Sequence, residues 1–177
     1  MNAQRVAVIG SLVLMVLAGH VLAVQETVDE RAQSLPRDQE MIQVLVEGGL
    51  DLAGEEDPLK RAAVCNRIAN GLAEEVKKAV GSKDSARAAK LGKQMQDLLV
   101  HGVAVNLTVA RETMKPNSPR EKAIFKLGAN VAGVAKSIED EVNNGGEPEK
   151  MKLMLQTVIE GKNSVDQAIH GKGPPKN

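Results

Sequence analysis

Apolar side chains recur at alternating intervals of three and four residues along most of this 177-residue chain. This interval places them on one face of an α-helix, because one helical turn contains 3.6 residues. We find no period-two alternation flanked by turn residues, the pattern that would indicate strands. The sequence therefore predicts an all-α fold, in which four long helices bury their stripes against one another as an antiparallel bundle.

Local signals predict where the helices begin. Asp57-Pro58 combines an N-cap residue with a proline suited to the first helical position, and Ser118-Pro119 does the same, with Glu121 completing a capping box. We expect the long helices at about 57–81, 84–114, 118–144 and 147–171. Their predicted inner stripes are Ala62, Cys65, Ala69, Leu72, Val76 and Ala79; Leu91, Met95, Leu98, Gly102, Val105 and Val109; Ile124, Leu127, Val131, Val134 and Ile138; and Met151, Met154, Val158, Gly161, Val165 and Ala168.

A shorter helix is expected ahead of these four. Its pattern begins at Arg37, and the pair Gly48-Gly49 interrupts it, because glycine is unfavourable inside a helix. The segment Gly48-Gly49-Leu50 is a candidate interaction surface. Of the two interpretations, covering the end of the bundle is favoured over remaining open to a partner.

The N-terminus is typical of an export signal. Arg5 supplies a positive charge, Val6 to Ala18 is apolar, and Ala23 is the small residue expected before a cleavage site. A cleaved signal over residues 1–23 would place the protein in the periplasm or outside the cell. The alternative is an uncleaved membrane anchor formed by Val6 to Val24.

The remaining chain divides into three predicted parts. Residues 24–36 are expected to be a polar lead-in, residues 37–171 the helical bundle domain, and residues 172–177 a flexible tail.

The composition excludes several classes of function. Phe125 is the sole aromatic residue, so the core must be built from small aliphatic side chains, and single-stranded nucleic acid finds no stacking platform. With 23 basic and 23 acidic residues, the chain has no excess positive charge for binding phosphates. No nucleic-acid partner and no cofactor are expected.

Cys65 is the single cysteine and falls on an inner stripe between Ala62 and Ala69. The favoured interpretation is a small apolar residue within the core. The alternatives are an intermolecular disulfide and a catalytic thiol, and the thiol would need a base and a cleft.

The best candidate for a metal site is an acidic cluster near a glycine turn. Oxygen ligands of this kind suit calcium or magnesium, although their spacing does not match the twelve-residue calcium loop. The alternative is a solvated helix end with Lys136 and Lys150 as ion-pair partners. The cluster comprises Glu139, Asp140, Glu141, Asn144 and Glu147.

Two stretches, DPLKRAAVCNRIANGLAEEVKKA and AKLGKQMQDLLVHGVAVNL, resemble an uncharacterised group of exported bacterial helical proteins over residues 57–107. The resemblance implies no enzymatic role and supplies no site residues. The sequence thus favours a non-enzymatic interaction, scaffold or regulatory module of the cell envelope, with an unidentified protein partner and an open oligomeric state. The alternatives are a periplasmic protein that binds divalent cations or senses stress, and a hydrolase combining distant acids with His101.

Overall fold

A computed structural model describes residues 28–145 and 148–171 of the chain. These residues are helical apart from short connections and contain no strand, which confirms the all-α prediction for this part of the chain. The chain divides into two units, one ending at Glu40 and the other beginning at Met41. The predicted signal segment and the predicted tail lie outside the described residues. Among the residues that the structure describes, no helix is both long enough and apolar enough to span a membrane.

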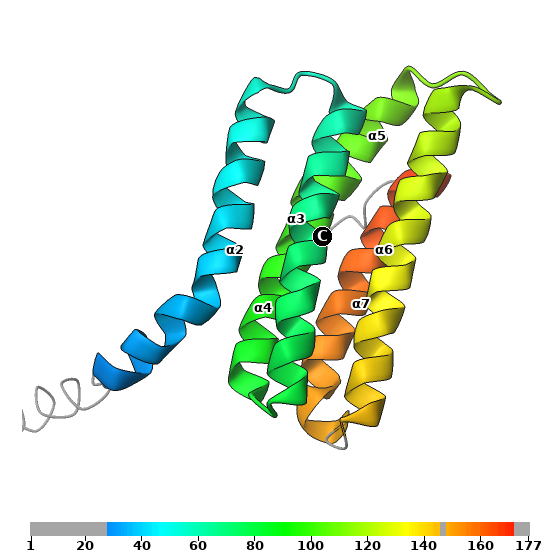
Figure 1. The fold of residues 1–177 in the computed structure, drawn as a ribbon. Helices are drawn as coiled ribbons and strands as arrows, with labels where there is room; N and C mark the ends of the chain where they lie inside the picture. The colour runs from blue at the N-terminus through cyan, green and yellow to red at the C-terminus, as the bar shows by residue number, and fades with distance from the viewer. Residues whose placement is uncertain (1–27, 146–147, 172–177) are drawn as a thin grey trace, which may run out of the picture. The chain divides into compact units, whose positions relative to one another are not determined.

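In the second unit, α3 (Pro58–Gly81) is followed by α4 (Ser85–Asp97), the π-helix η1 (Leu98–Ala104) and α5 (Val105–Glu112). These last three elements follow one another without a break and form one rod. The rods α6 (Pro119–Asn144) and α7 (Pro148–His170) complete the unit. Consecutive rods run in opposite directions (Figure 1).

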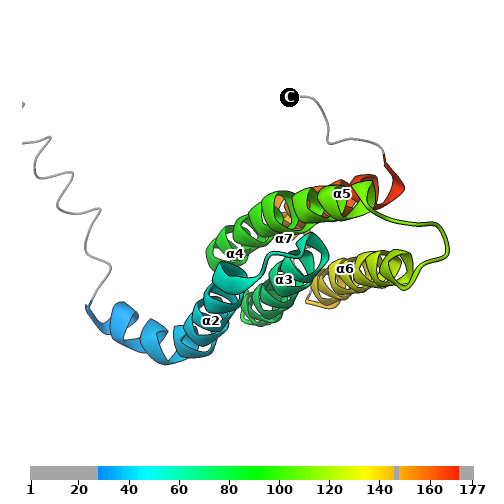
Figure 2. The same cartoon turned by 90° about the horizontal axis from the view of Figure 1, so that it is seen from above.

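The packing partners of the rods are not those of a simple up-and-down bundle. The rod of α4, η1 and α5 packs against α3 and α7, and α6 packs against α3 and α7 rather than mainly against α5, which precedes it. Seen from above, α3 and α6 form one layer and the rod of α4, η1 and α5 forms another with α7 (Figure 2). The contacting pairs α3–α6 and α4–α7 are therefore parallel, whereas α3–α4 and α6–α7 are antiparallel.

The predicted caps form. The Asp57 carboxylate accepts hydrogen bonds from the backbone N–H groups of Leu59 (2.7 Å) and Lys60 (3.3 Å) at the start of α3. The Ser118 hydroxyl accepts one from the Glu121 N–H (3.2 Å) at the start of α6. The Glu121 carboxylate accepts a hydrogen bond from the N–H of Asn117 (2.5 Å). In a standard capping box this partner would be the N–H of Ser118, one residue later in the chain.

The predicted inner stripes of α3 and α7 are buried throughout. The stripe predicted for residues 84–114 is wrong at Val105 and Val109, which are exposed, whereas Leu98 and Gly102 are half-buried and pack toward the core. The reason is η1, whose wider turn shifts the helical phase, so that Met95, Leu99, Val103 and Leu107 are buried at intervals of four. The residues buried from Met95 onward along this rod are Met95, Leu99, Val103, Ala104, Leu107 and Ala110.

The helix ahead of the four rods also differs from the prediction. It is α2 (Val28–Gly54), which begins within the segment expected as a polar lead-in. Gly48 and Gly49 do not interrupt it, so the expectation of a short, interrupted helix is wrong. Tertiary packing explains the continuous helix at Gly48. This glycine is buried against α3, and the close packing offsets the low helix propensity of glycine.

Candidate functional site: the exposed apolar face of α2

From Met41 onward, α2 has an inner apolar face that packs against α3. Val44 lies close to Gly71, where its Cγ1 would be 3.1 Å from a Cβ atom built on that glycine. A Cβ atom on Gly48 would overlap the side chain of Ile68, so only glycine allows α2 and α3 to approach this closely here. Met41 is buried at the same face. These contacts hold this part of α2 against α3.

A second apolar face of the same helix remains exposed. Ile42, Leu45, Val46 and Leu50 expose 52, 46, 56 and 71% of their surface, respectively. With Gly49 they follow the spacing i, i+3, i+4, i+7 and i+8, which places all five on one side of a helix. We call Ile42, Leu45, Val46, Gly49 and Leu50 the α2 stripe.

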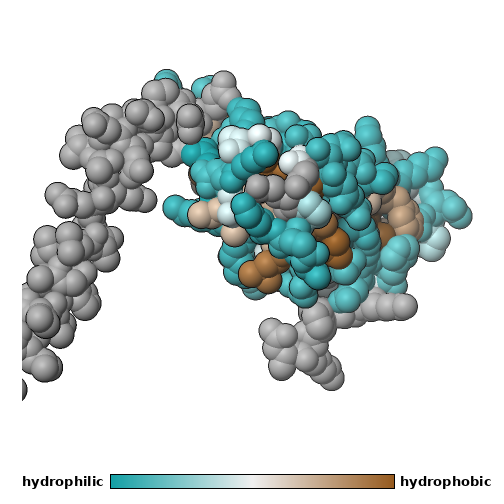
Figure 3. Space-filling view, turned by 90° about the horizontal axis from the view of Figure 1, so that it is seen from below, coloured by the Kyte–Doolittle hydropathy of each residue, from teal (hydrophilic) through white to brown (hydrophobic). Residues whose placement is uncertain are grey.

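The α2 stripe contains four of the nine large apolar side chains that are exposed among the described residues. The face seen from below is mainly hydrophilic, and its apolar residues form separate small groups (Figure 3). Leu153 on α7 is as exposed as Leu50, at 73%, but no other large exposed apolar residue lies within one helical turn of it. A helix that is apolar on two faces normally buries both, so the α2 stripe is the strongest candidate for an interaction surface.

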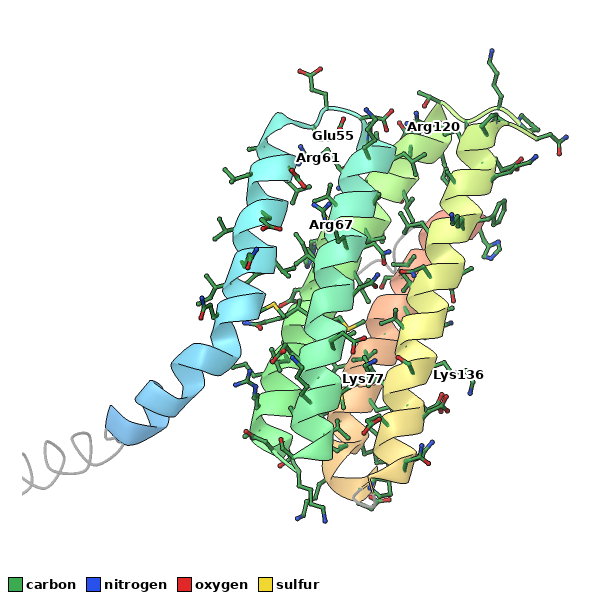
Figure 4. The ribbon with its side chains drawn as sticks, viewed as in Figure 1. Glu55, Arg61, Arg67, Lys77, Arg120 and Lys136 are labelled. Atoms are coloured by element: carbon green, nitrogen blue, oxygen red, sulfur yellow. The ribbon has the colours of Figure 1, made fainter. Side chains whose placement is uncertain are left out.

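The C-terminal end of α2 is held in place by charged side chains. Arg61 on α3 donates hydrogen bonds from Nη1 to the backbone carbonyls of Leu52 (3.3 Å) and Glu55 (3.0 Å). Figure 4 shows Arg61 and Glu55 beside the connection between α2 and α3. Because carbonyl groups at a helix end lack intrahelical partners, this guanidinium stabilises the end of α2. One turn earlier, Asp51 forms an ion pair with Arg67.

Arg120 joins three elements at the same end of the unit. Its guanidinium contacts both carboxylate oxygens of Asp57, at 3.0 and 3.3 Å, and its Nε donates to the Ala110 carbonyl at 3.3 Å. This link connects the cap of α3, the end of α5 and the start of α6. Hydrogen bonding from Arg120 holds the pKa of Asp57 below its usual value, because it favours the ionised carboxylate.

The structure agrees with the interpretation of Cys65 as a core residue. Cys65 is buried, and burial raises the pKa of its thiol, the opposite of what an activated nucleophile needs. Its Sγ would lie 2.8 Å from a Cβ atom on Gly102 of η1, so α3 and η1 meet at this pair. Neither the disulfide alternative nor the catalytic alternative has support from this position.

The adjacent acids Glu74 and Glu75 of α3 both form ion pairs. Glu75 is the one buried charged side chain of the described residues, and it pairs with Lys78 (2.7 Å) and Arg87 (3.0 Å), joining α3 to α4. Glu74 pairs with Lys77 at 2.7 Å. His101 is exposed on η1.

The candidate cation ligands lie around the end of α6. Lys136 and Asp140 form an ion pair at 3.3 Å, and the Glu141 carbonyl accepts a hydrogen bond from the Gly145 N–H at 2.8 Å. Glu147 lies outside the described residues. Among the residues that are described, no three His, Cys, Asp or Glu side chains are grouped so that they could hold a metal ion.

The structure also contains a cavity that the sequence did not predict. It has a volume of about 560 Å³ on α7, is open to solvent, and is lined by Asn163, Asp166, Gln167 and His170. Asp166 is paired with Lys162 at 2.6 Å, and the His170 ring lies 6.2 Å from that of Phe125. The sequence could not predict this cavity, because polar side chains on one helix form the same pattern whether they line a cavity or face open solvent.

Comparisons with protein-family models, with curated proteins and with solved structures find no match to this chain.

Proposed function

We propose that this protein is an exported, non-enzymatic helical interaction module of the cell envelope, which presents α2 to a protein partner. In this proposal residues 1–23 are the export signal, and the rods from α3 to α7 act as a four-helix scaffold that carries α2. The observation that supports the proposal is the α2 stripe, a continuous apolar face on a helix whose inner face is already packed.

The scaffold role is consistent with how α2 is held. The α2 stripe lies on the solvent side of a helix that is fixed along its inner face by Val44 and Gly48 and at its end by Arg61. An interaction surface on a preorganised helix loses less conformational entropy on binding than a flexible segment would. Such an arrangement suits recognition of a partner rather than chemistry.

Photocrosslinking tests this proposal. A photoreactive amino acid replaces Leu50 in one version of the chain and Leu153, which is equally exposed, in a matched control. After irradiation of the cell-envelope fraction, we expect discrete protein adducts from position 50 and none of the same mass from position 153. Identical adduct patterns at the two positions, or no adduct at position 50, would contradict the proposal.

A further inference from the structure

We infer that the α2 stripe binds an amphipathic helix whose apolar face is flanked by Lys or Arg side chains. The inference rests on the proposed function and deepens it by naming the chemistry of the partner. It is carried by the shape of the α2 stripe and by the charge of the helix that bears it.

The shape of the α2 stripe suits a helical partner. Residues 42 to 50 extend over about 12 Å, or roughly two helical turns, which matches the i, i+3, i+4 and i+7 face of an amphipathic helix. Apart from the neighbouring residues and backbone of α2 itself, no described atom lies within 4 Å of the position that a Cβ on Gly49 would take. This leaves space beside Val46 and Leu50 that a large apolar side chain of the partner can occupy.

The charge of α2 selects among possible occupants. The part of α2 that carries the stripe, from Met41 to Gly54, contains Glu47 and Asp51 and no basic residue, and of these two acids Asp51 is paired with Arg67 of α3. Beside the α2 stripe, Glu47 accepts a hydrogen bond from the neutral amide of Gln43 at 2.8 Å. Positive side chains flanking the apolar face of a partner would therefore find complementary charge along α2.

The same charge disfavours two other occupants. If two copies of the chain paired through their α2 helices, acidic side chains of both copies would lie side by side, and like charges at an interface are repulsive. An anionic lipid surface would meet the same repulsion, because membrane-binding helices carry Lys and Arg on their polar face. A basic amphipathic helix avoids both penalties.

Titration with synthetic helical peptides tests the inference on the full chain. One peptide carries Leu at i, i+3, i+4 and i+7 with Lys at the flanking positions, and its control carries Glu in place of Lys. Fluorescence anisotropy is expected to show at least about tenfold tighter binding of the Lys peptide, with an affinity that falls as salt is added. Leu50→Gln is expected to weaken this binding about tenfold, and Leu153→Gln to leave it unchanged.

Glu47→Gln separates charge from apolar contact. This variant keeps the α2 stripe intact, so the Lys peptide should still bind, but more weakly and with less dependence on salt. Circular dichroism of each variant checks that the fold is retained.

Four results would overturn the inference. They are equal affinity for the Lys and Glu peptides, no effect of Leu50→Gln, a dimer in light scattering that Leu50→Gln dissociates, and binding to phosphatidylglycerol vesicles that Leu50→Gln abolishes. Adducts at position 50 without a preference for the Lys peptide would reject this inference and leave the proposed function in place. Absence of adducts at position 50 would reject the proposed function itself.

Discussion

The contact between Cys65 and Gly102 shows how a core without large aromatic side chains becomes close-packed. The sequence predicted that Cys65 is buried, because it lies on a regular stripe of small residues. It could not identify Gly102 as its neighbour, since 37 positions separate the two and no local pattern connects them. The glycine lets η1 approach α3 until only a hydrogen atom fits between the helix backbone and the sulfur atom.

Replacing Gly102 should therefore be costly. Gly102→Ala is expected to lower the free energy of unfolding by roughly 1–3 kcal/mol, because the new methyl group meets Cys65 Sγ at 2.8 Å and Cys65 Cβ at 3.0 Å. Urea denaturation followed by circular dichroism measures the change. The matched control is Gly133→Ala, which has nothing within 4 Å and should raise the free energy of unfolding by about 0.5–1 kcal/mol.

Adding Cys65→Ala to the Gly102→Ala variant tests the cause. The double variant should regain part of the lost stability, because removal of the sulfur atom makes room for the methyl group. If Gly102→Ala proves as stable as Gly133→Ala, the close packing between α3 and η1 is wrong.

At the scale of the element, the π-helix η1 decides which side chains of its rod are buried. A regular α-helix from residue 84 to residue 114 would have buried Val105 and Val109, as the sequence predicted. In the structure Val103 is fully buried and Val105 is 53% exposed. Sequence periodicity could not reveal this shift, because a π-helix has no distinctive residue pattern and is favoured here by packing against α3 and α7.

Two identical substitutions measure the phase of this rod. Val103→Ala should lower the free energy of unfolding by about 2 kcal/mol, through lost apolar burial and the cavity that it leaves. Val105→Ala should change the free energy of unfolding by less than about 0.5 kcal/mol. Thermal and urea denaturation of both variants check this expectation. A larger loss of stability in Val105→Ala than in Val103→Ala would support the uninterrupted α-helix that the sequence predicted.

At the scale of the whole second unit, Arg120 connects elements that are far apart in the sequence. Its contacts with Asp57 and with the Ala110 carbonyl join the cap of α3 to α5 and α6. Asp57 was predicted as a helix cap, but its pairing with Arg120 was not, because it depends on the two parallel helices α3 and α6 starting at the same end. Figure 4 shows Arg120 at this end and Lys136 farther along α6.

This pairing predicts how stability depends on pH. The folded state holds the pKa of Asp57 below its ordinary value of 3.8, so the stabilisation is complete above that value and is lost as pH falls through the folded pKa. Arg120→Gln should lower the free energy of unfolding by about 1 kcal/mol at neutral pH, and its difference from the unmodified protein should shrink below about pH 4. Urea denaturation over this pH range measures both effects.

Lys136→Gln serves as the control for Arg120→Gln. Lys136 and Asp140 form an exposed pair on the same helix, and exposed pairs contribute little, so the change should stay below about 0.5 kcal/mol at every pH. A difference between Arg120→Gln and the unmodified protein that persists undiminished in acid would contradict the role assigned to Asp57.

The sequence by itself determined the all-helical class, the caps at Asp57 and Ser118, and the buried stripes of α3 and α7, because these depend on neighbouring residues within one or two turns. Tertiary structure decided which rods lie together, where the π-helix forms, and that Leu50 remains exposed although covering was the favoured interpretation. These features depend on contacts between residues far apart in the chain. An apolar side chain on a helix has the same local pattern whether it faces a core or solvent, and only its neighbours in space distinguish the two.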